Sequence, residues 1–245
     1  MKNFEKKIIL GVGFTVASEE EILEFITKGL LKQTEKYYVV TPNPELLVIA
    51  NNNREYKGIL NSAKLALPDG VGVLLGGYLL DKPLMGRITG VDLVESLCKR
   101  VSKQPITVGF LGAGPNIAVK TAECLRKKYP KLRVKYAVQE PNDDIKNTPV
   151  DILFVAFGSP KQEIWINENL NRLPVKIAIG VGGAFDFISG KVTRAPQFVR
   201  QIGFEWLFRL FTQPWRIKRQ LSLLTFIVLL LEDKFFHNTQ NLPNR

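Results

Sequence analysis

The sequence predicts an α/β fold in which a mostly parallel sheet carries helices on both faces and a helical appendage follows at the C-terminus. Short runs rich in β-branched and aromatic residues alternate with helical patterns, which is typical of repeated β-α-β units. Two of these runs, residues 152–157 and 176–181, are almost continuously apolar, as expected for strands buried on both faces. The chain contains no internal repeat and no low-complexity linker.

The individual elements follow from hydrophobic periodicity and from the residues that cap or break helices. The predicted strands are Lys7–Gly11, Tyr37–Thr41, Lys64–Leu67, Ile106–Leu111, Arg133–Val138, Asp151–Phe157 and Lys176–Val181. The predicted helices between them are Glu19–Lys32, Pro44–Asn52, Gly90–Val101, Pro115–Lys128 and Lys161–Asn171. Because ligands of such sheets bind beyond the carboxyl ends of the strands, the loops that follow the strands are the candidates for a site.

The pattern changes near Ala195. Residues 197–211 predict one amphipathic helix and residues 215–231 predict another. We therefore expect a core domain over residues 1–194 and a basic appendage over residues 195–245.

The appendage combines positive charge with a short apolar run. Between residues 194 and 220 the only acid is Glu205, against six basic residues: Arg194, Arg200, Arg209, Arg216, Lys218 and Arg219. The eleven residues Leu221–Leu231 carry no charge, whereas a membrane-spanning helix needs about 20 apolar residues. The segment therefore predicts an anchor at an anionic membrane surface, and the alternative is a helix packed on the core or on another subunit.

The composition limits the kind of site. The 34 Lys and Arg residues exceed the 23 Asp and Glu residues by 11, which favours an anionic partner such as nucleic acid, anionic lipid or a phosphorylated substrate, unless the charge is merely solubilising. The only histidine, His237, lies near the end of the chain, which disfavours a Ser-His-Asp triad, a histidine-rich zinc site or a HExxH site. Two separated cysteines and an N-terminus that resembles a strand more than a signal peptide predict a cytoplasmic protein.

Two loops present side chains suited to acid–base chemistry or sugar binding. Thr41 and Asn43 stand in a Thr-Pro-Asn-Pro turn after a strand, where Asn43 either binds a ligand or only caps the next helix. Asp69 stands in a Leu-Pro-Asp-Gly turn after another strand, where a general base would lie, although Pro-Asp-Gly is also an ordinary turn sequence. The lack of a competing histidine or cysteine base favours the role of base for Asp69.

Two further loops contain glycine beside a helix start. Arg87 lies between Gly86 and Gly90, which suits the approach of a diphosphate, unless Asp92 simply caps the helix and Arg87 is solvated. Gly112 and Gly114 follow the strand 106–111 and begin like a dinucleotide fingerprint. The third glycine of that fingerprint is replaced by Ile117, so a nicotinamide cofactor is not specifically indicated.

The last two loops follow the last two predicted strands. In residues 158–163 the other side chains suit the start of a helix, so Gln162 is either a substrate contact or an ordinary surface residue. In residues 180–186, Gly182 and Gly183 predict a close approach of the backbone to a ligand, and Asp186 either pairs with a polar group such as a ribose or closes a turn.

Taken in order, the motifs TPN, LPDG, RITG, FLGxG, GxPKQE, GVGGAFD, RAP and GFEWLFRL resemble the WecG/TagA/CpsF family over nearly the whole chain. The resemblance implies an inverting, metal-independent and membrane-associated bacterial glycosyltransferase with a Rossmann-like core, no cofactor and a C-terminal appendage that helps to form the site. It implies a UDP-sugar donor, N-acetylmannosamine in the TagA branch, and an acceptor linked to a polyprenyl diphosphate. Other members use other sugars, including N-acetylmannosaminuronic acid, so the donor class is better defined than the donor.

The resemblance also assigns roles by position. Asp69 matches the catalytic base, and four core residues match substrate-site positions: Thr41, Asn43, Arg87 and Gln162. Three arginines of the appendage are expected to meet the diphosphate: Arg209, Arg216 and Arg219. Ala113 and Phe204 are mild departures from the family pattern.

Two other functions stay open at this point. A nicotinamide-dependent oxidoreductase is suggested by the loop at Gly112, although its fingerprint is incomplete. A nucleic-acid-binding protein is suggested by the charge alone, but the aromatic residues near Trp206 have the helical spacing of a core, so we expect no nucleic acid as partner. The sequence leaves the oligomeric state open, including a homo-oligomer.

Overall fold

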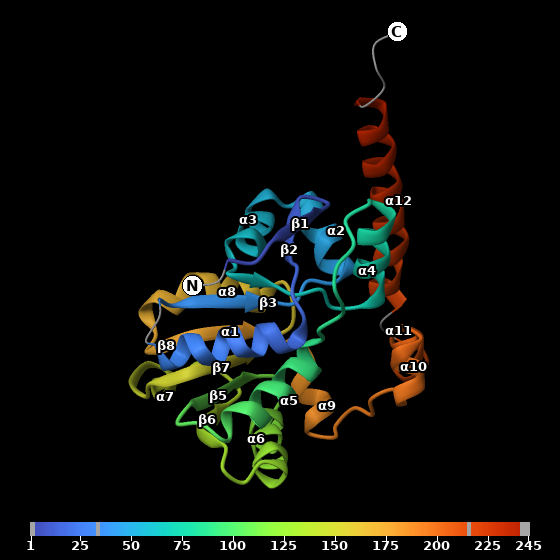
Figure 1. Ribbon diagram of the computed structural model, residues 1–245. Coiled ribbons are helices and arrows are strands. Elements are labelled where there is room, and N and C mark those ends of the chain that lie inside the picture. The colour runs from blue at the N-terminus through green and yellow to red at the C-terminus, as the bar shows by residue number, and fades with distance from the viewer. Residues whose placement is uncertain (1–2, 33–34, 215–216, 241–245) are drawn as a thin grey trace.

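A computed structural model describes residues 3–32, 35–214 and 217–240 (Figure 1). Its centre is a six-stranded sheet with the order β4-β3-β8-β7-β5-β6, in which every neighbouring pair is parallel. The strands are β3 (Tyr37–Val40), β4 (Leu65–Ala66), β5 (Thr107–Gly112), β6 (Arg133–Val138), β7 (Val150–Ala156) and β8 (Val175–Gly180). The predicted α/β fold with a parallel sheet is confirmed.

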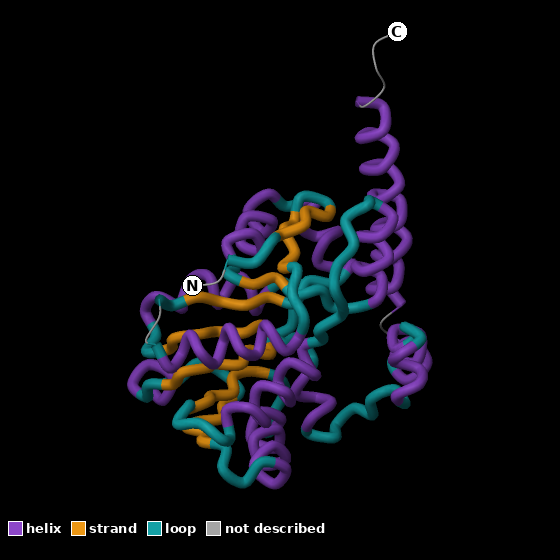
Figure 2. The backbone as a smooth tube through the Cα atoms, viewed as in Figure 1, coloured by secondary structure: helices purple, strands orange, loops and turns teal. Residues whose placement is uncertain are grey.

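Helices cover both faces of this sheet (Figure 2). One apolar cluster joins the sheet to α1 (Glu19–Leu31), α5 (Gly90–Val101), α6 (Ile117–Lys128) and α9 (Ala184–Ile188). The other joins it to α2 (Pro44–Asn52), α3 (Arg54–Ser62), α7 (Asp143–Asn147) and α8 (Lys161–Asn169), which the short helix η1 (Leu170–Arg172) continues. The interior strand β7 alternates between the clusters, since Ile152 and Phe154 face the first while Leu153 and Val155 face the second.

The first predicted strand does not belong to this sheet. β1 (Lys6–Ile9) pairs with β2 (Val12–Thr15) in a separate two-stranded antiparallel sheet. The two residues of the turn, Leu10 and Gly11, have φ values of +48° and +78°, as a tight hairpin requires. The prediction extended the strand through Gly11 because the apolar run gives no sign of this turn.

The helix α4 (Val71–Leu79) was not predicted because its three glycines lower helix propensity. Its place in the fold explains two of them. A Cβ atom at Gly76 would lie 3.0 Å from both Phe226 and Leu230, and one at Gly72 would lie 2.8 Å from Pro44. Glycine therefore lets α4 pack closely against α2 and against the C-terminal helix.

The C-terminal part also differs from its prediction. The single helix expected over residues 197–211 is two helices, α10 (Gln197–Gln201) and α11 (Glu205–Thr212), because Gly203 between them has a φ of +83°. α12 (Ile217–Gln240) extends nine residues past the predicted end at Leu231, and its last turns project beyond the rest of the molecule (Figure 1). Among the helices that the structure describes, none is long and apolar enough to cross a membrane.

α12 presents apolar residues on two sides. Phe226 and Leu230 are buried against α4 and α2, so the alternative of a helix packed on the core describes this side. The exposed apolar stripe of α12, as we name it, consists of side chains at i, i+3, i+7 and i+10: Leu221, Leu224, Val228 and Leu231. It faces away from the protein.

Candidate active site

The predicted loops meet at the carboxyl edge of the parallel sheet. Backbone hydrogen bonds join them in pairs, from Asp69 N to Pro42 O (3.0 Å), Ile88 N to Pro68 O (2.9 Å), Ala113 N to Ala156 O (2.9 Å) and Val181 N to Val155 O (2.9 Å). Each bond joins segments that are far apart in sequence, so the edge forms one connected surface. A parallel sheet binds its ligands at this edge.

Asp69 lies half-buried on the turn between β4 and α4. Burial raises the pKa of its carboxyl group to about 7, and the carboxylate of Glu205 acts in the same direction. The guanidinium groups of Arg87 and Arg209 oppose this rise, and Asp92 adds a smaller contribution to it. A carboxyl group with a pKa near neutral pH is matched to accepting a proton during catalysis.

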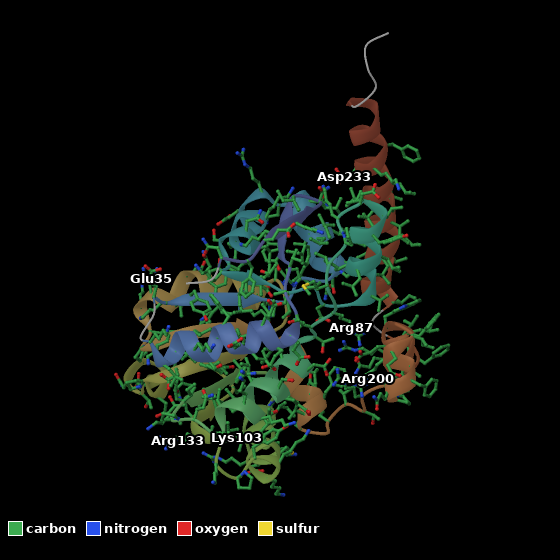
Figure 3. The ribbon with its side chains drawn as sticks, in the orientation of Figure 1. Glu35, Arg87, Lys103, Arg133, Arg200 and Asp233 are labelled. Atoms are coloured by element: carbon green, nitrogen blue, oxygen red, sulfur yellow. The ribbon has the colours of Figure 1, made fainter. Side chains whose placement is uncertain are left out.

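The charges around Asp69 come from two parts of the chain. Arg87 and Asp92 belong to the core, on the loop before α5 and in the first turn of α5. Glu205 and Arg209 belong to α11 in the appendage. Figure 3 shows Arg87 on the side of the molecule where α10 and α11 face the core. The structure thus brings the predicted Asp69, Arg87 and Arg209 together.

Thr41 and Asn43 support the loop beside Asp69. The buried Thr41 hydroxyl donates a hydrogen bond of 3.2 Å to the carbonyl of Gly180 at the end of β8. The Asn43 Oδ1 atom accepts a bond of 3.1 Å from Leu46 N and so caps α2, as the capping alternative predicted. Capping uses the oxygen of the Asn43 carboxamide, so binding of substrate through its NH2 group stays a prediction.

Gln162 connects two loops of the edge. Its side chain is buried, with Oε1 accepting a hydrogen bond of 2.9 Å from Gly182 N. Its Nε2 donates to Ser159 Oγ at 3.2 Å and to Glu163 Oε1 at 2.7 Å. The carboxamide therefore joins the loop after β8 to the start of α8, and a direct contact with substrate stays a prediction.

The buried partner of Gln162 was not predicted from the sequence. Glu163 is fully buried and accepts hydrogen bonds from Ser159 Oγ at 2.8 Å and from the Tyr56 hydroxyl at 3.1 Å. Burial raises the pKa of the Glu163 carboxyl group. Tyr56 belongs to α3, a helix that was not predicted, so nothing in the sequence linked it to this loop.

The loop after β5 needs its first glycine. Gly112 has a φ of +112°, and a Cβ atom there would lie 2.8 Å from the backbone of Ala156. Ala113 and Asn116 also have positive φ values, +64° and +61°, and α6 begins only at Ile117. The turn is therefore tight but differs from the sequence of a dinucleotide fingerprint.

Gly114 and Asp186 share a neighbour, Lys191, that was not predicted from the sequence. Lys191 Nζ lies 3.5 Å from Asp186 Oδ1 and 3.3 Å from the Cβ position of Gly114. This ammonium group therefore lies between the loop after β5 and α9. No motif assigned a role to Lys191, which is why it was missed.

The loop after β8 meets the appendage. Gly182 has a φ of +55°, and the Cβ position of the exposed Gly183 lies 3.6 Å from Arg209 Nη2. The guanidinium carbon of Arg209 stands 4.7 Å from the ring centre of Phe187, in a cation–π contact. α11 therefore brings a cation to the sheet edge from outside the core.

The structure does not describe the side chains of the other two predicted arginines, Arg216 and Arg219. Arg216 lies outside the described residues, and Arg219 belongs to α12 in a stretch where the structure does not describe the side chains. Within residues 3–32, 35–214 and 217–240, no group of three or more His, Cys, Asp or Glu side chains is arranged to hold a metal ion.

Residues 7–240 match the family described as glycosyl transferase WecG/TagA/CpsF family. The chain belongs to this family. It is a glycosyltransferase of the hexosyltransferase type, which decides against the oxidoreductase alternative.

Three similar proteins carry the name N-acetylglucosaminyldiphosphoundecaprenol N-acetyl-beta-D-mannosaminyltransferase. The relative from Bacillus spizizenii is 36% identical over 226 residues, 88% of each chain. The relative from Bacillus subtilis is 28% identical over 94% of this chain and 93% of its own. The relative from Staphylococcus aureus is 30% identical over 95% of this chain and 94% of its own.

Proposed function

We propose that this glycosyltransferase transfers N-acetylmannosamine from UDP-N-acetylmannosamine to N-acetylglucosamine linked to undecaprenyl diphosphate. The product is a β-1,4-linked disaccharide, the linkage unit of wall teichoic acid. The names of the relatives support the substrates, because they describe this donor sugar and this acceptor. The observation that carries the proposal is the half-buried Asp69 among arginines from the core and the appendage.

The proposed chemistry is a single displacement that inverts the anomeric carbon. Asp69 accepts the proton of the acceptor hydroxyl as the oxygen attacks, and UDP leaves from the opposite face of the sugar. A positioned general base contributes typically about 10²–10⁴-fold to the rate. The raised pKa of Asp69 gives its carboxylate the proton affinity that this step needs.

The leaving diphosphate gains negative charge, which cationic side chains stabilise without a metal ion. The charges of Arg87 and Arg209 both act on Asp69, and we assign these two arginines to this role. Guanidinium groups suit phosphate oxygens because they donate two parallel hydrogen bonds. Arg216 and Arg219 join them in the proposal on the strength of the family resemblance.

We place the enzyme in the cytoplasm, attached peripherally to the inner face of the cell membrane. The exposed apolar stripe of α12 supports this location, because contiguous exposed apolar residues mark contact surfaces. α4 adds two exposed apolar side chains beside α12, Leu75 and Tyr78. An anionic lipid surface suits the basic residues that precede the stripe in sequence.

The test is transfer by the purified enzyme from UDP-N-acetylmannosamine to a soluble lipid-diphosphate acceptor analogue. We expect Asp69→Asn to lower kcat by about 10²-fold or more. The matched control is Asp143→Asn, an exposed carboxylate of α7, which keeps wild-type turnover. Near-normal turnover by Asp69→Asn contradicts the role of base.

A panel of UDP-sugars decides the donor. The proposal expects the highest kcat/KM with UDP-N-acetylmannosamine. A higher value with UDP-N-acetylmannosaminuronic acid would instead support the alternative donor within the same family and leave the role of Asp69 in place.

A further inference from the structure

Arg194 stands where the core ends and the appendage begins, and it contacts both. Its Nη1 atom lies 2.7 Å from Asp92 Oδ1, and its Nη2 donates a bond of 3.3 Å to Thr89 Oγ1. Its Nε atom lies 3.7 Å from Glu205 Oε1 at the start of α11. One guanidinium group therefore bridges the start of α5 in the core and the start of α11.

These groups are not ordinary surface charges. The side chains of Arg194 and Glu205 are 18% and 17% exposed, so water screens their interaction less than that of a surface pair. Thr89 fixes the acceptor, because its hydroxyl donates a bond of 2.7 Å to Asp92 Oδ2 and accepts one of 3.2 Å from Asp92 N. The Arg194 interaction contributes to holding the pKa of Asp92 below its usual range, despite partial burial.

The bridge ends beside the proposed base. Glu205 and Arg209 both act on Asp69 from α11, and Arg87 and Asp92 act on it from the core. A second contact supports the same placement, since a Cβ atom at Gly203 would lie 2.8 Å from Val71, two residues after Asp69. No residue of α10 or α11 is fully buried, so a hydrophobic core does not hold these helices.

We propose that Arg194 is a positioning residue for glycosyl transfer: by binding Asp92 and Glu205 together, it holds α11 against the turn that carries Asp69. Glu205 is then a carboxylate placed to tune the base, and Arg209 is the cation that α11 delivers. Arg194 itself touches no reacting atom. This inference rests on the proposed role of Asp69 for its effect on catalysis, but not for its effect on the position of α11.

The first test follows hydrogen exchange of the backbone amides in the full-length protein. We expect Arg194→Met to speed exchange in α10 and α11 by about tenfold or more, since it removes the partly buried ion pair between Arg194 and Glu205, and to leave β7 and β8 unchanged. Arg54→Met, which removes an exposed arginine of α3, is the matched control. Wild-type protection of α11 in Arg194→Met overturns the proposal, whatever Asp69 does.

The second test uses the pH dependence of kcat/KM, which a merely structural role would not move in this way. Glu205→Gln removes a carboxylate that faces Asp69, so the acidic limb of the profile shifts to lower pH. In an Arg194→Met background Glu205 is no longer held there, so the same substitution produces a much smaller shift. Equal shifts in the two backgrounds would contradict the positioning role.

Arg194→Lys distinguishes positioning from loss of the fold. Lysine keeps the positive charge but lacks the planar fork that reaches two carboxylates at once. We expect its kcat to lie between those of the wild type and Arg194→Met. If Arg194→Lys and Arg194→Met both keep wild-type kcat, the proposal is wrong.

Discussion

The two sides of the candidate active site are held in place by different interactions. The core side consists of loops that follow buried strands and are joined by backbone hydrogen bonds, as between Asp69 and Pro42. The appendage side consists of α10 and α11, which bury no residue and meet the core through Gly203, ion pairs and the contact of Arg209 with Phe187. Hydrogen bonds within a packed core form one cooperative unit, whereas a segment with few buried contacts opens at a lower free-energy cost.

The position of the proposed base and the position of Arg209 therefore depend on different interactions. Asp69 keeps its position as long as the sheet is folded. Arg209 keeps its position only while α11 is held against the core. A site divided in this way allows α10 and α11 to be displaced without unfolding the core, and the following predictions test that division.

The largest effect is expected at the appendage side. Arg209→Ala removes a cation beside Asp69 and is expected to lower kcat by about 10²-fold or more, since a single charge-stabilising donor is worth about that much. Its melting temperature should stay close to that of the wild type because α11 buries no residue. Steady-state kinetics and thermal unfolding measure the two quantities, and Arg172→Ala, an exposed arginine of η1, is the control. A strongly lowered melting temperature contradicts the division.

A substitution on the core side is expected to act mainly on stability. Gly112→Ala introduces a Cβ atom 2.8 Å from the backbone of Ala156 at a φ of +112°, so we expect the free energy of unfolding to fall by about 2 kcal/mol or more. Gly58→Ala is the matched control: nothing lies within 4 Å of that Cβ, and alanine in α3 should stabilise by about 0.5–1 kcal/mol. Denaturant titration measures the free energy of unfolding of both variants. Equal values would contradict the conclusion that the turn requires glycine at position 112.

The exposed apolar stripe of α12 is the part of the appendage that we expect to bind the membrane. The double substitution Leu224→Glu and Val228→Glu is expected to lower partitioning into anionic phospholipid vesicles by about tenfold or more, since one buried side chain of this size contributes about 1.5–3 kcal/mol. Leu31→Glu, an exposed apolar residue of α1, should bind as the wild type does. Flotation with vesicles measures the bound fraction. Undiminished flotation of the double variant shows that the stripe is not the anchor.

The smallest effect is expected on stability, because ionisation of the half-buried Asp69 destabilises the folded protein. The pKa of Asp69 rises from 3.8 to about 7 on folding, so between these values the unfolded chain has lost a proton that the folded protein retains. Stability from this group is therefore present at low pH and is lost as pH rises through 7. Asp69→Asn should raise the melting temperature relative to the wild type by about 2 °C or more at pH 8, with a smaller difference at pH 4. A difference that does not depend on pH contradicts the raised pKa.

The core side could be predicted from the residues and their spacing, whereas the appendage side was expected only from the family resemblance. Apolar strands followed by Pro, Gly and Asn turns placed Thr41, Asp69 and Gly182 at one edge, because a parallel sheet brings its strand ends together. The sequence did not reveal that Gln162 is held at both ends, since its partners come from another loop and from a buried neighbour.

The missed residues share a physical reason. Arg194 and Glu205 act through contacts across more than one element, and charge counting along the chain cannot show which carboxylate an arginine meets. The break at Gly203 was missed because amphipathic spacing continues across it. The helix α4 was missed because its glycines serve packing against α2 and α12, which local propensity does not register.

The central claim is that Asp69 is the base of this glycosyltransferase and that its pKa is set by burial and by charges from both sides of the site. The most direct measurement is kcat/KM for sugar transfer as a function of pH, in the wild type and in Asp69→Asn. We predict an acidic limb with an apparent pKa near 7 in the wild type and its disappearance in the variant, together with a large loss of rate. An acidic limb that persists at the same pH in Asp69→Asn would contradict the claim.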